Sequence, residues 1–132
     1  MFTQAVKDMD SRALARHCRE LAENKKAEKI TILDVRKVSD VTDYYVVATG
    51  TSEPHLRAIV NEIADTLKIE HGIVPSARDG SLETAWVVLD YFDVIVHVMR
   101  SDVRDHYKLE ELWGDAPRIR TRKQKAPPSN GA

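Results

Sequence analysis

Residues 86–99 read Trp-Val-Val-Leu-Asp-Tyr-Phe-Asp-Val-Ile-Val-His-Val-Met, and this stretch decides the fold. Its β-branched and aromatic residues predict two strands, near 86–90 and 93–99, with the reversal at Tyr91-Phe92. A Tyr-Phe pair does not favour the positive φ of tight hairpin turns, so we expect a wider turn with an even loop. The opposed pairs are then Asp90 with Asp93, Val88 with Ile95, and Trp86 with His97, all on one face.

A helical segment near 101–113 follows the hairpin, and together they hold both tryptophans of the chain. Large aromatic side chains beside acidic groups are favoured at binding surfaces. The segment contains no nucleophile-and-base pair and no cluster of metal ligands. The residues therefore indicate recognition of a partner rather than catalysis.

The rest of the chain predicts an α/β domain. An amphipathic helix is expected over about 4–24, a strand over 30–38 and an interior strand over 44–49. A second helix is expected to begin at an N-cap, Ser52, with Pro54 in its first turn, and to end at Gly72. Residues 78–81, Arg-Asp-Gly-Ser, predict a turn. The fold class is one domain, residues 1–116, with a mixed β-sheet flanked by helices.

Charge is distributed unevenly between this domain and the C-terminal tail, residues 117–132. Five of the 20 basic residues and none of the 21 acidic ones lie between Arg118 and Ala132, which leaves 15 basic against 21 acidic in the rest. The tail should be disordered, because it has little to bury. An acidic body suits a basic protein partner better than nucleic acid, and any phosphate contact is left to the tail.

Three chemical alternatives are less favoured. A strand, Gly50-Thr51-Ser52 and a helix resemble the entry to a nucleotidyl-transfer site, but no Asp-x-Asp pair stands near to hold a metal. Asp102 and His106, with His97, could share a metal, although the helix dipole also explains their positions. Cys18 lacks a base and a third partner, so it is not favoured as a nucleophile. The single cysteine and the lack of a run of roughly 20 apolar residues indicate a cytoplasmic protein away from membranes.

Four blocks resemble the ribosomal silencing factor family, also called Iojap or RsfS, over about residues 6–115. They are 42–52 (Thr-Asp-Tyr-Tyr-Val-Val-Ala-Thr-Gly-Thr-Ser) with His55, 86–91, 93–99, and Tyr107-x-Leu109-Glu110-x-Leu112-Trp113. One position differs: the family usually has Gly where this chain has Phe92, and a bulky ring cannot take a glycine-only conformation without strain. Either the turn is remodelled, or Phe92 adds apolar contact to the partner.

The resemblance implies a protein that is not an enzyme and needs no cofactor or metal. The family binds the universal L-fourteen protein of the large ribosomal subunit, blocks joining of the small subunit sterically and represses translation. Its fold resembles nucleotidyltransferases without their catalytic carboxylates. Contact of the tail with ribosomal RNA, and a homodimer through the apolar hairpin face, are left open. The resemblance places partner contacts at Trp86, Asp90, Tyr91, Tyr107 and Glu110.

Overall fold

The computed structural model describes residues 9–107 and 118–119. The elements follow the chain in the order α2 (Ser11–Asn24), β1 (Glu28–Asp34), β2 (Tyr44–Gly50), α3 (Glu53–His71), β3 (Ala77–Ser81), β4 (Trp86–Asp90), β5 (Val94–Arg100), α4 (Ser101–Tyr107) and β6 (Arg118–Ile119). The strands form one sheet in the order β3-β4-β5-β2-β1-β6. Among the described strands, the β2–β5 pair alone is parallel, so the predicted mixed sheet flanked by helices is confirmed.

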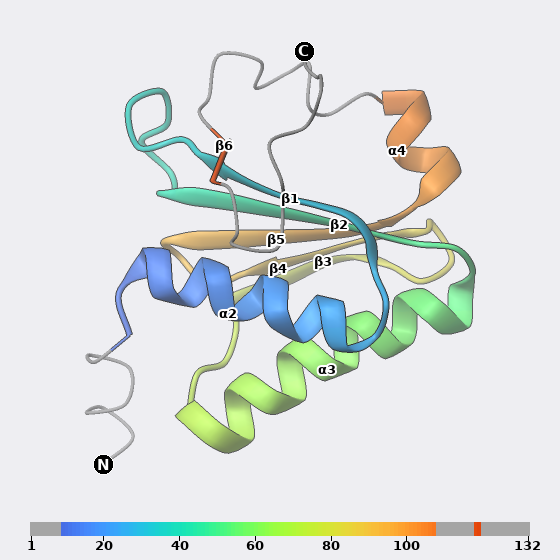
Figure 1. The fold of residues 1–132 in the computed structure, drawn as a ribbon, viewed down its shortest axis with the longest axis horizontal. Helices are drawn as coiled ribbons and strands as arrows, with labels where there is room; N and C mark the ends of the chain where they lie inside the picture. Colours follow the sequence, from blue (N-terminus) through green and yellow to red (C-terminus); the bar gives the residue numbers. More distant parts are fainter. Residues whose placement is uncertain (1–8, 108–117, 120–132) are drawn as a thin grey trace.

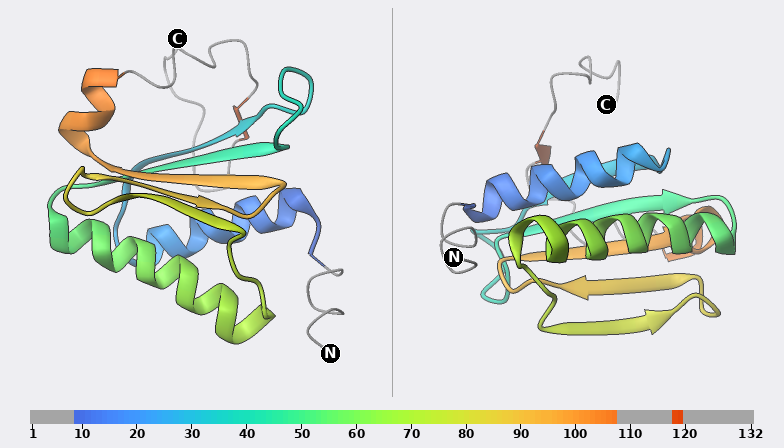
Figure 2. Two further views of the ribbon diagram at one scale, coloured as in Figure 1. Left: turned by 180° about the vertical axis from the view of Figure 1, so that it is seen from behind. Right: turned by 90° about the horizontal axis from the view of Figure 1, so that it is seen from below.

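The sheet separates two layers of unequal size. Helices α2 and α3 cover one face, whereas α4 lies on the other side of the sheet (Figures 1 and 2). The main core lies between the sheet and α2 and α3, where apolar side chains from both helices meet alternate residues of β2, β4 and β5. Side chains that point to the opposite face form two smaller clusters.

Local signals fix the helix ends well. Ser52 accepts a hydrogen bond from the His55 N–H at 3.2 Å, Pro54 lies in the first turn, and Gly72 ends α3 with φ 67°. These three predictions are confirmed. Helix α2 begins at Ser11, because Asp10 is extended and its carboxylate accepts from the Ala13 N–H at 2.8 Å. Residues 4–8 of the predicted helix lie outside the described part of the structure.

The prediction of a turn at 78–81 is wrong, because these residues form most of β3. The chain reverses one step later, at 82–85, and Ala85 takes φ 63°. Gly80 is needed in the strand itself, since a Cβ there would lie 2.0 Å from the Trp86 carbonyl oxygen. The Asp-Gly pair that is typical of turns here allows close approach between two strands.

The hairpin register is also shifted from the prediction, by two residues. The chain reverses at Phe92, where the Asp93 N–H donates to the Tyr91 carbonyl at 2.9 Å and the Tyr91 N–H donates to the Val94 carbonyl at 2.8 Å. A shift of two keeps every side chain on its predicted face. The observed pairs are Asp90 with Ile95, Val88 with His97, and Trp86 with Met99.

The C-terminal boundary differs in one detail. Arg118 and Ile119, assigned to a disordered tail, form β6 and pair with Leu33 and Ile32 of β1. Residues 120–132 lie outside the described part of the chain. Strand β1 ends at Asp34 rather than 38, because the Asp34 carboxylate accepts from the Arg36 N–H at 3.1 Å and turns the chain.

Candidate partner-binding face

One patch of the sheet, on the side away from α2 and α3, collects the aromatic and acidic residues singled out by the sequence. Strand pairing places these residues together, because directly opposed residues share a face. We call this patch the aromatic face, and it consists of Tyr45, Trp86, Val88, Asp90, Ile95 and His97. Tyr45, Trp86, Val88 and Asp90 are half-buried, whereas Ile95 and His97 are buried. The aromatic face therefore combines partly accessible aromatic rings with buried side chains that pack beside them.

Trp86 and His97 form the centre of the aromatic face. The Trp86 indole Nε1–H donates to His97 Nδ1 at 3.0 Å, and the two ring centroids are 5.9 Å apart. The Tyr45 ring lies 5.4 Å from the His97 ring. Because an indole nitrogen can only donate, His97 must accept at Nδ1 and carry its proton on Nε2. Burial lowers the pKa of His97 to about 4, so the ring is neutral at physiological pH.

Asp90 stabilises the turn beside this centre. Its Oδ1 accepts a hydrogen bond from the Phe92 N–H at 2.8 Å. Phe92 takes φ 71°, and its side chain is 71% exposed. The turn is therefore tighter than the wider turn that was predicted. Phe92 occupies a conformation that favours glycine, and its ring projects into solvent.

We expect Phe92→Gly to raise the free energy of unfolding by about 0.5 to 1 kcal/mol. A left-handed conformation costs a non-glycine residue roughly 1–2 kcal/mol, and the greater unfolded-state entropy of glycine offsets part of that gain. Chemical denaturation of both proteins measures the change. Lower stability in the variant would show that the exposed ring makes stabilising contacts that outweigh the backbone strain.

The same end of the sheet exposes two further apolar side chains. Val38 and Val41, in the loop between β1 and β2, are 61% and 71% exposed. This loop lies beside the hairpin turn, because the Asp43 N–H donates to the Asp93 carbonyl at 2.9 Å. Val38, Val41 and Phe92 form an apolar rim, which extends the accessible surface beyond the aromatic face.

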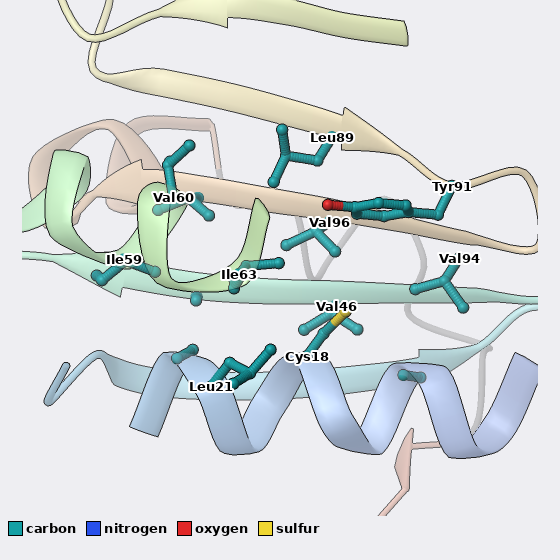
Figure 3. Packing of buried hydrophobic residues seen from close by; sticks show 14 of the residues in the cluster. Cys18, Leu21, Val46, Ile59, Val60, Ile63, Leu89, Tyr91, Val94 and Val96 are labelled. Atoms are coloured by element: carbon teal, nitrogen blue, oxygen red, sulfur yellow. The ribbon is translucent and has the colours of Figure 1, made fainter. Parts of the chain in front are cut away.

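The structure contradicts the prediction that Tyr91 contacts a partner. Its side chain is only 6% exposed and points into the core covered by the helices, among Leu89, Val94 and Val96 (Figure 3). Burial also raises the pKa of the Tyr91 phenol above its ordinary value. The alternation of β4 explains the placement, since Val87, Leu89 and Tyr91 are two residues apart and share the core face.

The structure describes the side chains of only two of the other four predicted contact residues. Trp86 and Asp90 lie together on the aromatic face, as expected. Tyr107 ends α4, but its side chain, like Glu110 and Trp113, lies outside the described part of the structure. Tyr45 was missed because its strand is apolar on both faces. Its spacing from Val47 and Thr49 is the signal that places it on this face.

The polar groups of the strand-to-helix turn at Gly50–Ser52 form hydrogen bonds within the protein. His55 Nδ1 accepts from the Thr51 N–H at 2.9 Å, and its Nε2 lies 2.7 Å from the Lys25 carbonyl oxygen. Ser52 Oγ accepts from the His55 N–H. These backbone N–H groups, which would face a phosphate in a nucleotide site, already have partners. The turn joins α2 to α3 instead.

The structure also explains the residues behind the other two chemical alternatives, a metal site at Asp102 and a nucleophile at Cys18. The Asp102 carboxylate accepts from the Arg100 guanidinium at 2.6 and 3.0 Å, and this pairing lowers the pKa of Asp102. Cys18 is fully buried in the core (Figure 3), and burial raises the pKa of its thiol to about 12. A protonated, inaccessible thiol is a poor nucleophile.

Comparison with known proteins identifies the family. A family model described as "Ribosomal silencing factor during starvation" matches residues 8–132. The chain belongs to the ribosomal silencing factor family. Ribosomal silencing factor RsfS of Bacillus subtilis is 38% identical over 109 residues, which cover 83% of this chain and 92% of that protein.

Two further similar proteins are a solved bacterial structure and a mouse protein. A crystal structure of a Chromobacterium violaceum protein covers 91% of this chain and 98% of its own, with a TM-score of 0.76 and 32% identity. A mouse relative named "Mitochondrial assembly of ribosomal large subunit protein 1" is 30% identical over 95 residues, covering 70% of this chain and 42% of that protein.

Within the described residues, no helix combines the length and apolar character needed to cross a bilayer.

Proposed function

We propose that this ribosomal silencing factor binds the large ribosomal subunit through the universal L-fourteen protein. Bound there, it would block joining of the small subunit by its bulk and so repress translation in the cytoplasm. The observation that carries the proposal is the aromatic face, in which half-buried Trp86 and Tyr45 lie next to Asp90 on the side of the sheet away from α2 and α3. The family membership supplies the ribosome as the partner.

The chemistry of the surface favours a basic protein partner. Trp86 provides a large apolar anchor, and a fixed ring loses little entropy on binding. Asp90 adds an acidic group beside it, and the body of the chain has an excess of acidic residues. A cationic protein surface would complement both features. The contacts that we propose are Trp86, Asp90, Tyr107 and Glu110.

The test is sedimentation with isolated large subunits. The purified protein should sediment with them and, as it is added, reduce the amount of joined ribosomes. Trp86→Ala should weaken binding by roughly 2 kcal/mol or more, which is about 30-fold in Kd. Asp90→Asn should weaken it less, because the amide oxygen can still accept from the Phe92 N–H while the charge is lost.

Ile69→Ala is the matched control. Ile69 lies in α3, on the other side of the sheet, and is 77% exposed. This variant should bind as the unmodified protein does. If Trp86→Ala keeps its fold and binds equally well, Trp86 is a packing residue and the aromatic face is not the interface. If the unmodified protein stays in the supernatant, the ribosomal proposal itself fails.

Two secondary proposals concern the tail and self-association. We propose that the basic tail contacts ribosomal RNA. Removal of residues 120–132, which leaves β6 in place, should then reduce the salt dependence of subunit binding. We also propose that a second copy competes for the aromatic face. Light scattering over a concentration series should then show a dimer that Trp86→Ala weakens.

A further inference from the structure

A cluster of metal-ligating side chains lies on the helix side of the sheet, away from the aromatic face. His17 projects from the middle of α2, and Glu70 and His71 lie in the last turn of α3. One ligand atom from each of the three residues lies within 4.8 Å of the others. The two imidazole rings meet edge to face, with centroids 5.1 Å apart. The antiparallel packing of α2 and α3 therefore brings together three residues that are far apart in sequence.

His17 has the arrangement of a metal-binding histidine. Its Nδ1 lies 3.5 Å from Glu20 Oε1, and its Nε2 is buried without a hydrogen-bond partner. A carboxylate near Nδ1 favours the proton on that nitrogen, which leaves the lone pair on Nε2. Histidines that bind metals commonly hold their second nitrogen against a carboxylate in this way. A buried nitrogen with no partner is costly unless a ligand satisfies it.

The backbone adds a favourable field for a cation. Helix α3 ends at His71, and Gly72 stops it in a left-handed conformation. The C-terminal end of a helix carries partial negative charge from its unpaired carbonyl groups. Glu20 and Glu70 add two carboxylates at the same place, and both are exposed enough to change rotamer. Arg12 and Arg16 line the adjacent hollow and oppose a cation, whereas Asp10 and Glu20 line the same hollow and offset their charge.

We propose that His17, Glu70 and His71 bind a zinc-type divalent cation that joins α2 to α3. Two imidazoles and one carboxylate are the donor set that zinc prefers, whereas calcium and magnesium favour oxygen ligands alone. Ligand atoms on one zinc ion lie at most ~4 Å apart, so small rotations of His71 and Glu70 complete the site. The fourth position faces an open hollow of about 480 Å³ beside α2.

The test is calorimetric titration of the full chain, without an affinity tag, with zinc chloride alone. One zinc ion should bind per chain, and the melting temperature should rise with zinc but not with magnesium. Cobalt(II) should give the visible absorption of a tetrahedral site. His17→Gln, His71→Gln and Glu70→Gln should each weaken zinc binding at least about tenfold. Since Glu70 is exposed, Glu70→Gln should leave the fold unchanged.

His106→Gln is the control, because it removes a histidine from α4, on the other side of the sheet. That variant should bind zinc as tightly as the unmodified protein. The proposal is overturned if zinc does not bind saturably, if the three cluster variants bind it normally, or if His106→Gln abolishes binding. None of these results depends on ribosome binding, so this proposal and the ribosomal one can fail separately.

Discussion

Arg104→Met is expected to lower the free energy of unfolding by about 2 to 3 kcal/mol. Arg104 lies in α4, is only 5% exposed, and reaches across to the first two strands. Its Nη1 donates to the Lys29 carbonyl and, at 2.6 Å, to Thr49 Oγ1, while Nη2 donates to Thr31 Oγ1 at 3.1 Å. Methionine fills similar space but donates to none of these oxygens. Thr49 is buried, Thr31 is half-buried and Lys29 is exposed, so the main cost falls on Thr49 Oγ1. An acceptor left buried without a donor costs roughly 1–3 kcal/mol.

The geometry of β1 explains why an arginine is needed there. Lys29 takes φ 48°, and the pairing of β1 with β2 is irregular between Glu28 and Thr31. The Lys29 carbonyl is thereby available to a side chain. The planar guanidinium satisfies that carbonyl and both threonine hydroxyls with one rigid group. Arg104→Lys should therefore recover only part of the stability, because a single ammonium cannot reproduce the fork.

Arg57→Met is the control for this experiment. Arg57 pairs with Glu53 at 3.5 Å on the surface of α3, and its side chain is 59% exposed. Exposed pairs of this kind contribute little, so the variant should change stability by less than about 0.5 kcal/mol. Chemical denaturation of the two variants gives the comparison. Equal, small losses would mean that the Arg104 contacts are replaced by water at no cost.

Local signals explain which parts of the fold could be predicted from the sequence. The ends of α3 depend on Ser52, Pro54 and Gly72, which act within their own turns. The interior strand β2 follows from apolar side chains on both faces. In contrast, the acceptors of Arg104 are 55 to 75 residues away, so nothing near it in the sequence indicates burial. A charged residue in an amphipathic helix looks like a surface residue until the tertiary fold supplies its partners.

The candidate site was predicted in part for the same reason. The period of two in β4 and β5 placed Trp86, Asp90 and His97 on one face, and a register error of two residues did not change that. The turn itself could not be predicted, because Phe92 adopts a conformation that its type disfavours. Tyr91 looked like a contact residue beside two acids. Tyr91 is buried because it lies two residues from Leu89 and therefore points to the same face of the sheet, whatever its neighbours in sequence are.

Acid should weaken the fold through His97 before the carboxylates titrate. The ordinary pKa of histidine is about 6.5, and burial lowers that of folded His97 to about 4. Between these values the unfolded chain binds the proton and the folded chain does not, so the free energy of unfolding falls as the pH falls. The loss through His97 should reach about 3 kcal/mol near pH 4 and then stop growing. Asp34 and Asp102 have lowered pKa values, so their contributions are lost only below their ordinary value of 3.8.

His97→Asn isolates this effect from the rest of the chain. The asparagine Oδ1 can still accept from the Trp86 indole N–H, but the side chain does not titrate. Denaturation at pH 7 and at pH 4.5 should show a smaller loss of stability in the variant than in the unmodified protein. An NMR titration of the His97 ring protons should show no protonation above about pH 5 in the folded state. A normal titration near 6.5 would mean that the imidazole is solvated. Burial would then not hold the ring neutral, and the centre of the aromatic face would be looser than the 3.0 Å contact between Trp86 and His97 indicates.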